Sequence, residues 1–307
     1  MNKNFKLKLF FYLASFVSMA LLFCMASKES ASQNNEISVS FEKKIEITLI
    51  NPLNIHRYNE PIAIPIKLII EKYSDFNKDF FRIKNKSFKF EPLDIPTQIK
   101  MVPGSGIEEI VFQVDLEPKE EKIIELWYNH EGVGLPEYPA RTQSIEGYGP
   151  DGSNIAWESE HIAYRSYSGI VDFFGKTYPH LRMHDLEFGS YHHEKLWGID
   201  PFIVGKTPGL GGVILFKDKA VLQCYGGESL KYAKKAIKGG PVCSGAVIKI
   251  EDKSTPLIES VYTIFSDRYE NNVVTAILDM ESREEILIAP GILKFKDETV
   301  IFEGNKG

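Results

Sequence analysis

The sequence contains little cysteine. It has three cysteines in 307 residues, and only Cys224 and Cys243 follow the first thirty residues. No two cysteines have the close spacing of a zinc site, so a zinc finger and a disulfide-rich scaffold are both excluded. In an oxidising compartment the two later cysteines could form one disulfide, and two buried thiols are the alternative. We predict that Cys224 and Cys243 lie close enough to bridge.

An excess of positive charge is also absent, because the formal net charge is -6. Nucleic-acid binding is therefore not predicted. There is no internal repeat, no heptad pattern and no H-E-x-x-H motif, and "HDLEFGSYHHE" matches no metal-site spacing. The segment 205–212, "GKTPGLGG", lacks the residue order of a phosphate loop and predicts a tight turn close to a ligand or another strand. We therefore predict no metal and no cofactor.

Long apolar runs are missing except near the amino terminus. Three lysines precede "FFYLASFVSMALLF", which is shorter than the ~20 residues that a spanning helix needs. This pattern favours a signal peptide over residues 1–26, followed by a polar spacer over residues 27–36. Lipidation at Cys24 is the alternative, although Phe23 is bulky for a lipoprotein signal. We expect an exported protein without a membrane span, periplasmic or associated with the outer membrane.

The rest of the chain is rich in isoleucine and valine, with several alternating apolar and polar runs between turn signals. This pattern predicts an all-β protein, with a β-sandwich over residues 37–129 and a second β-rich part over residues 130–307 that carries the site. Residues 130–154 predict a long ordered loop. Short helices are expected only at residues 178–187 and 228–237.

Histidine is unevenly distributed. Only His56 precedes residue 130, and the other six histidines lie between His130 and His193 among carboxylates and aromatic residues. Histidine is the usual general base and a common metal ligand. A solvent-exposed polar surface without a functional role would explain these histidines equally well. Trp197 lies in a segment without strand alternation and is a better ligand candidate than Trp127, which we expect in the core.

Three blocks of the second half resemble a known family. "WESEHIAYR" (157–165), "DFFGK" (172–176) and "YHHEKLWGIDPFIVG" (191–205) follow the order of the central blocks of a bacterial secreted family known as domain of unknown function 4861. The earlier "NPLNIHRYNEPIAIPI" is similar to the amino-terminal half of that family. The resemblance extends from about Ile47 to Ala289.

The resemblance implies a β-supersandwich similar to galactose-mutarotase-like sugar enzymes, encoded among genes for sugar and uronate utilisation. It does not imply a settled reaction. Family members continue beyond "LIAPGILKF", whereas this sequence ends at Gly307, so we expect a shortened carboxyl-terminal part. The matching positions that we expect to be catalytic are His192, Lys176, Asp172 and Arg165. Those that we expect to bind substrate are Trp197, Asp200, Glu158 and Tyr191.

Three functions remain open. The first is an enzyme that acts on uronic-acid-containing oligosaccharides by hydrolysis or β-elimination. In an elimination, Arg165 or Lys176 would bind the substrate carboxylate and His192 would act as the base. Hydrolysis would instead use two carboxylates, drawn from Glu158, Asp172 and Asp200. The alternatives are a non-catalytic carbohydrate-binding protein and a structural surface protein of a polysaccharide-utilisation system.

Overall fold

The computed structural model describes residues 8–10, 41, 43–86, 93–131, 136–149, 152–184, 194–201, 204–205, 207–217, 220–222, 225–226, 230–252, 255–278 and 286–292. The chain divides into two compact units. Unit 1 comprises residues 1–99, 108–138 and 301–307, and unit 2 comprises residues 100–107 and 139–300. The sequence pattern predicts a division after residue 129, whereas the main change from unit 1 to unit 2 lies between Tyr138 and Pro139, and residues 100–107 also belong to unit 2.

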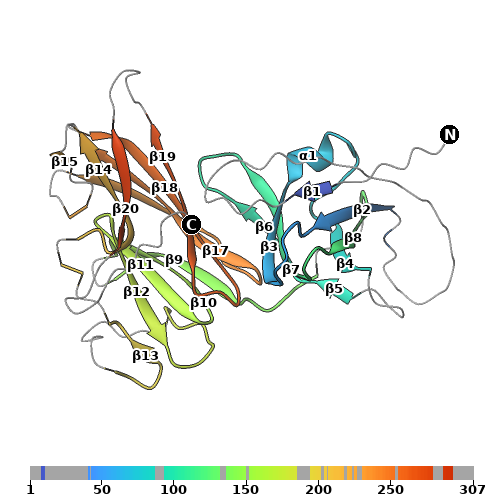
Figure 1. Ribbon diagram of the computed structural model, residues 1–307, viewed down its shortest axis with the longest axis horizontal. Helices are drawn as coiled ribbons and strands as arrows, with labels where there is room; N and C mark the ends of the chain where they lie inside the picture. Colours follow the sequence, from blue (N-terminus) through green and yellow to red (C-terminus); the bar gives the residue numbers. More distant parts are fainter. Residues whose placement is uncertain are drawn as a thin grey trace. The chain divides into compact units, whose positions relative to one another are not determined.

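Unit 1 consists of strands and one short helix. Its elements are β1 (Lys8–Phe10), β2 (Lys43–Ile50), β3 (Arg57–Pro65), α1 (Ile66–Ile70), β4 (Phe81–Asn85), β5 (Leu93–Ile95), β6 (Thr97–Met101), β7 (Glu108–Leu116) and β8 (Glu121–Tyr128). One sheet has the strand order β1-β2-β8-β4-β5, and a second has the order β3-β7-β6 (Figure 1). Only the contact between β1 and β2 is parallel among the strand pairs described in this unit.

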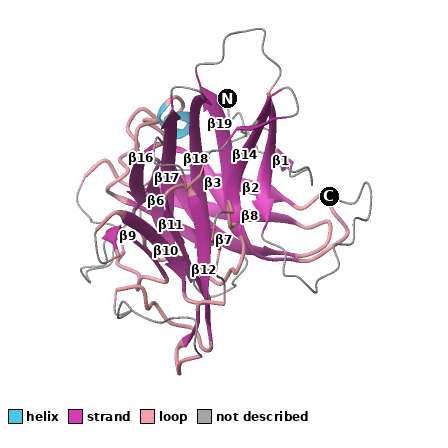
Figure 2. Ribbon diagram, turned by 90° about the vertical axis from the view of Figure 1, so that its left-hand side faces the viewer, coloured by secondary structure: helices cyan, strands magenta, loops and turns pink. Residues whose placement is uncertain are grey.

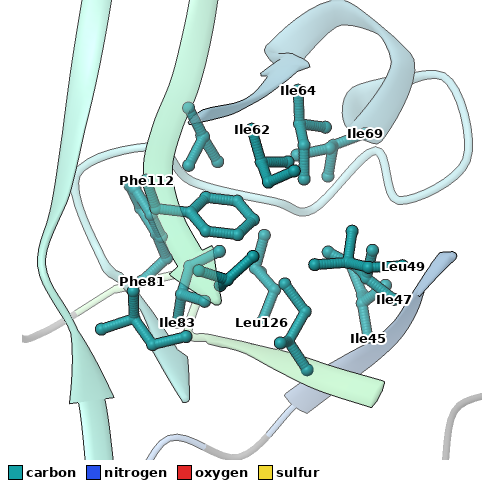
Figure 3. Close-up of a cluster of buried hydrophobic side chains, with 14 of the residues drawn as sticks. Ile45, Ile47, Leu49, Ile62, Ile64, Ile69, Phe81, Ile83, Phe112 and Leu126 are labelled. Atoms are coloured by element: carbon teal, nitrogen blue, oxygen red, sulfur yellow. The ribbon is translucent and has the colours of Figure 1, made fainter. Parts of the chain in front are cut away.

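Alternation along the strands builds the core of unit 1. On β2, the side chains of Ile45, Ile47 and Leu49 are buried, whereas Lys44 on the same strand is partly exposed. Figure 3 shows these aliphatic side chains meeting those of β3, β4 and β8, with the ring of Phe112 among them. This packing of two sheets confirms the β-sandwich pattern predicted for this part of the chain.

Strands are the regular secondary structure of unit 2 among the residues that the structure describes. They are β9 (Thr142–Tyr148), β10 (Asn154–Ser159), β11 (Ile162–Tyr167), β12 (Ile170–Lys176), β13 (Gly198–Ile199), β14 (Leu210–Lys217), β15 (Ala220–Leu222), β16 (Lys231–Ile237), β17 (Cys243–Asp252), β18 (Thr255–Phe265), β19 (Asn271–Leu278) and β20 (Leu287–Ile292). They form three sheets with the orders β13-β12-β11-β10-β9, β15-β14-β20 and β16-β17-β18-β19. Figure 2 shows how completely strands dominate the described chain, which confirms the all-β class.

The sheet β9–β13 is covered on both faces. Trp157 and Tyr164 are cross-strand neighbours on one face, where they pack with Tyr262 of β18 in the main core of unit 2. The indole N–H of Trp157 donates to Asn271 Oδ1 at 3.2 Å, so its polar atom is satisfied. The other face holds a smaller apolar cluster that includes Phe174 and Met183. A strand buried on both faces must therefore accommodate its charged residues inside the protein.

Three expected features of the secondary structure were wrong. The helix predicted at residues 228–237 is instead strand β16, whose side chains alternate in exposure while it pairs with β17. Lysine and alanine favour helices, but pairing with a neighbouring strand outweighs that preference. The loop predicted over residues 130–154 contains strand β9.

The helix predicted at residues 178–187 is also absent from its described part. Residues 178–184 form bends and a turn, and residues 185–187 lie outside the described residues. The backbone groups there are used elsewhere. The N–H groups of Arg182 and Met183 donate to the Glu158 carboxylate, and the carbonyl of His180 accepts from Lys176. A helix would need those groups for its own ladder.

The next predictions concern the segment 205–222 and the two cysteines. β14 and β15, which follow each other in the sequence, pair antiparallel. Gly209, in the predicted tight turn, has φ +71°, and a Cβ there would lie 1.8 Å from the carbonyl oxygen of Val171 on β12. That turn therefore approaches another strand, as predicted. Cys243 is buried, and Cys224 lies outside the described residues.

The amino-terminal expectations concern residues that are mostly not described. The predicted signal peptide lies outside the described residues except for β1, and the spacer 27–36 and Cys24 lie outside them entirely. Within the part of the chain that the structure describes, no helix is long and apolar enough to cross a membrane.

Candidate functional site

The three sequence blocks meet on one face of the sheet β9–β13. Glu158 and Arg165 come from β10 and β11, Asp172 and Lys176 from β12, and Asp200 directly follows β13. The strand register puts Arg165 opposite Asp172 across β11 and β12. Because directly opposite residues in antiparallel strands share a face, this register brings the charged residues together. Figure 1 shows these adjacent strands in green to yellow.

Glu158 and Lys176 form a buried ion pair. Their side chains are 0% and 1% exposed, and Lys176 Nζ donates to Glu158 Oε2. The Lys176 ammonium also donates to the carbonyl oxygens of Ser159 at 2.6 Å and His180 at 2.7 Å. An ammonium has three donors, so all of its hydrogen-bonding capacity is used inside the protein. Burial lowers the pKa of Lys176, and the nearby Glu158 charge opposes that effect.

The Glu158 carboxylate also accepts several hydrogen bonds from the protein. Besides Lys176, it accepts a hydrogen bond from the amide of Gln143 on β9. It also accepts the backbone N–H groups of Arg182 and Met183, each at 2.8 Å. The carboxylate therefore ties the segment 177–184 to the sheet. Its contacts satisfy the requirement that a buried charge be both paired and hydrogen-bonded.

A second ionic group surrounds Arg165. One guanidinium nitrogen, Nη2, donates to Asp172 Oδ2 at 2.5 Å and to Asp200 Oδ2 at 3.3 Å. The two aspartate side chains are 1% and 0% exposed, whereas that of Arg165 is 14% exposed. Burial acts to lower the pKa of Arg165, but the charges of both aspartates outweigh it and raise that pKa.

Aromatic rings enclose this ionic group. The Arg165 guanidinium lies 4.8 Å from the ring centroid of Phe174 and 5.2 Å from that of Tyr167. Trp197, from the third sequence block, packs against Phe174 with ring centroids 6.1 Å apart. Burial, together with the Asp172 charge, raises the pKa of Tyr167 to about 12, so this phenol stays protonated at neutral pH.

The edge of this site is partly open to solvent. Tyr178 is 51% exposed, and its ring stacks on that of His180 with centroids 4.1 Å apart. Thr177 holds the neighbouring turn in place, because its hydroxyl donates to the Leu196 carbonyl at 2.6 Å and its N–H donates to the Trp197 carbonyl at 3.0 Å. The side chain of Leu196 is 94% exposed.

The histidines do not form one cluster among the described residues. His130 lies in unit 1, where its ring contacts the Asp75 carbonyl. His161 and His180 lie in separate surroundings in unit 2. Tyr191, His192 and His193 lie outside the described residues, so the catalytic role expected of His192 and the binding role expected of Tyr191 remain predictions.

One group of side chains has the residue types of a metal site. Glu160, His161 and Asp267 offer ligand atoms within 4.8 Å of one another. However, the Arg141 guanidinium pairs with Glu160 and lies 3.8 Å from Asp267, and His161 Nε2 is 3.0 Å from Asp267. Arg141 thus already supplies the positive charge that a metal ion would bring to these carboxylates.

The structure brings together on this face most of the residues that the family blocks predict as site residues. Six of the eight expected site residues lie among the described residues, and all six belong to the β9–β13 sheet or to the segment that follows Lys195. Tyr167, Tyr178 and Arg182 were not singled out individually. The only sequence signal for them was the concentration of tyrosine and charge around the first two family blocks.

The fold and the site define an all-β protein of two units, with a buried ionic network on one sheet of the second unit. Residues 49–299 match the family model described as a domain of unknown function (DUF4861). This match covers more than half of the chain, and the chain therefore belongs to that family. No curated protein and no solved structure matches the chain.

Proposed function

We propose that this chain is an exported carbohydrate-active protein whose site recognises uronic-acid-containing oligosaccharides. The observation that carries this proposal is the arrangement on the β9–β13 sheet, where Arg165 joins Asp172 and Asp200 against the rings of Tyr167 and Phe174, and Trp197 packs on Phe174. Carbohydrate sites combine aromatic faces with hydrogen-bonding charged groups in this way. The finer fold assignment, a β-supersandwich similar to galactose-mutarotase-like enzymes, is part of the same proposal and is supported by the antiparallel sheets of unit 2.

Catalysis is the first form of the proposal. Two carboxylates about 5–5.5 Å apart are typical of retaining glycosidases. Asp172 and Asp200 both contact one guanidinium nitrogen, and they are the described pair of carboxylates that could serve in such a reaction. In a β-elimination the base would be His192. In a hydrolysis the bound sugar would have to reach Asp172 and Asp200, whose side chains are almost fully buried beside Arg165.

Non-catalytic binding is the second form, and a specific observation favours it. The described ionisable groups predicted to react are held by protein partners. Lys176 uses all three donors, and Asp172 and Asp200 are bound to Arg165 with at most 1% of each side chain exposed. A site whose charges are fixed in this way can position aromatic faces and hydrogen bonds for a sugar without transferring a proton.

One experiment separates these two forms. The full-length protein is incubated with uronic-acid oligosaccharides while reducing ends, unsaturated products and binding heat are measured. If the protein is an enzyme that uses His192, His192→Ala should lower turnover by roughly 10²–10⁴-fold, and the matched variant His193→Ala should have much less effect. Binding heat without product supports the binding form, in which Trp197→Ala should weaken affinity. Neither binding nor turnover on any uronic-acid oligosaccharide would refute the proposal.

The proposed export has its own test. The basic and apolar amino-terminal residues support cleavage near residue 26, with periplasmic or outer-membrane-associated localisation. Amino-terminal sequencing of protein isolated from the native cell should find the first ~26 residues removed. An intact Met1 on cytoplasmic protein would contradict export, and a lipid on Cys24 would support export by the alternative route.

A further inference from the structure

The positive charges on this face of the sheet differ in how they are balanced. Arg165 contacts two aspartates, and Lys176 contacts Glu158 and two carbonyl oxygens. Arg182 is different: no ion pair joins its guanidinium to any residue in the described part of the chain. A cation that is balanced within the protein has little left to offer a ligand, whereas an unbalanced guanidinium can still bind an anion.

Arg182 is also partly buried. Its Nε atom is shielded from solvent and has no hydrogen-bond partner among the described residues. A buried donor that lacks a partner is costly, and such a group in a native structure calls for an explanation. A ligand cannot reach the shielded Nε, but the two terminal nitrogens of the Arg182 guanidinium are not among the shielded atoms, and they can donate two parallel hydrogen bonds to a ligand carboxylate.

The backbone at Arg182 is fixed before any ligand binds. Its N–H donates to Glu158 Oε1 at 2.8 Å, and so does the N–H of Met183, whose side chain is 2% exposed in the apolar cluster of this face. On the other side, the His180 carbonyl accepts from Lys176, and the His180 N–H donates to the Glu160 carbonyl at 2.8 Å. Because this backbone is already ordered, it loses little conformational entropy when a ligand binds, and this favours affinity.

An aromatic ring lies on the same short segment. Tyr178 is half exposed and is held in a stack with His180. Four residues separate Tyr178 from Arg182, so their Cα atoms are at most about 14 Å apart. An exposed aromatic ring can pack against the C–H surface of a sugar, and a guanidinium within this distance can contact a charged substituent of the same oligosaccharide.

We propose that Arg182 binds the carboxylate of an acidic sugar and that Tyr178 packs against a sugar ring of the same ligand. This inference rests on the proposed function and deepens it, because it assigns recognition of the acidic group to Arg182 rather than to Arg165 or Lys176. Arg182 then determines specificity for acidic over neutral sugars. The buried pair Glu158–Lys176 positions it through the backbone.

Two matched ligands test the proposal. Binding of full-length protein to a galacturonic acid trisaccharide is compared, by calorimetry, with binding to the same trisaccharide whose carboxylates are reduced to alcohols. The variants are Arg182→Gln, Arg182→Lys and Tyr178→Ala, with Lys235→Gln on β16 as an exposed control in the same unit. Thermal unfolding of each variant is measured in parallel.

The wild-type protein should prefer the acidic trisaccharide. Arg182→Gln should weaken binding of the acidic form about ten-fold or more, with almost no change for the neutral form and in melting temperature. Arg182→Lys should lie between the two, because lysine keeps the charge but loses the paired hydrogen bonds. Tyr178→Ala should weaken binding of both trisaccharides to the same degree, and Lys235→Gln should bind as the wild type does.

Other outcomes overturn the proposal in distinguishable ways. If the wild type binds the acidic trisaccharide and Arg182→Gln binds it equally well, the role of Arg182 is refuted while the proposed function stands. Equal losses for acidic and neutral forms, or a large fall in melting temperature, would show that Arg182 is structural. If the wild type binds no uronic-acid oligosaccharide, the proposed function and this inference fail together.

Discussion

The buried pair of Glu158 and Lys176 leads to a quantitative prediction about stability. In Lys176→Met the ammonium is replaced by an apolar group of similar length. The Glu158 carboxylate then stays buried with its remaining donors, which are the Gln143 amide and the N–H groups of Arg182 and Met183. The Ser159 and His180 carbonyls lose a donor. Removing one partner of a buried ion pair lowers the free energy of unfolding by about 3–5 kcal/mol. Because the remaining donors still hydrogen-bond the Glu158 carboxylate, we expect a loss of about 3 kcal/mol in this variant.

The reverse variant, Glu158→Gln, adds a dependence on pH. The amide oxygen can still accept the N–H groups of the segment 177–184, but Lys176 is left without its carboxylate. Burial already lowers the pKa of Lys176, and removal of Glu158 removes the main opposing effect. The native state then binds fewer protons than the unfolded state at pH values between the lowered pKa and about 10.4. Stability of Glu158→Gln should therefore rise with pH across that range.

Urea denaturation followed by tryptophan fluorescence measures both effects. A Trp127→Phe background removes the one tryptophan of unit 1, so the signal comes from Trp157 and Trp197 of unit 2. The control is Lys249→Met, which breaks a partly exposed pair with Glu259 on β17 and β18 and should cost less than about 1 kcal/mol. The double variant Lys176→Met, Glu158→Gln should lose clearly less stability than the sum of the losses in the two single variants.

A different set of results would refute this account of the pair. A loss of less than about 1 kcal/mol in Lys176→Met would mean that the pair contributes no more than the surface control does. Additive losses in the double variant would mean that the two side chains do not interact. A Lys176→Met protein that keeps its stability and loses only turnover on uronic-acid oligosaccharides would instead support the predicted catalytic role of Lys176.

Two further predictions concern the packing of unit 2. In Gly198→Ala, a Cβ at φ +147° would lie 1.9 Å from the Gly175 carbonyl oxygen, so pairing of β12 with β13 should be disrupted. The loss should be at least about 1–3 kcal/mol in urea titrations, and an unchanged midpoint would contradict the described contact. Burial raises the pKa of Tyr164 and of Tyr262 to about 12. Because these values exceed the unfolded value of about 10, the stability they contribute is complete below pH 10 and is lost as the pH rises towards 12. Tyrosinate absorbance and tryptophan fluorescence should therefore change together over that range, and titration of all tyrosines near pH 10 in a folded protein would exclude the effect.

Local patterns predicted the fold class because strands of this protein alternate clearly or are continuously apolar. The two helices that were predicted wrongly share one cause. β16 contains lysine and alanine, which favour helices, and becomes a strand through its partner β17. The segment 178–184 lost its predicted helix because Glu158 and Lys176, distant in the sequence, bind its backbone groups. Both outcomes depend on contacts between distant residues, which a window of sequence does not contain.

The same reason limits prediction of the site. Residue types and family blocks identified Glu158, Arg165, Asp172, Lys176 and Asp200, but the sequence does not state which charge pairs with which. Strand register decides this. It places Asp172 opposite Arg165. It also brings Lys176 to Glu158 rather than to solvent. A lysine that looked like a substrate-binding cation in the sequence is thus fully occupied, while Arg182, which had no sequence signature, keeps its charge unbalanced in the described structure.

These pairings suggest why the polar residues of the three blocks occur together. A buried ion pair adds little net stability compared with a well-packed apolar pair, so stability alone is a weak reason for placing four or five charges inside one sheet. Directional contacts offer a stronger reason. Glu158 fixes the backbone next to Arg182, and Arg165 fixes Asp200, which follows the short strand β13. Apolar packing could not specify the position of these irregular segments so closely. We infer that the ionic network primarily positions the segments that bear Tyr178, Arg182 and Trp197, and that loss of any one of its members should disturb ligand binding through those segments.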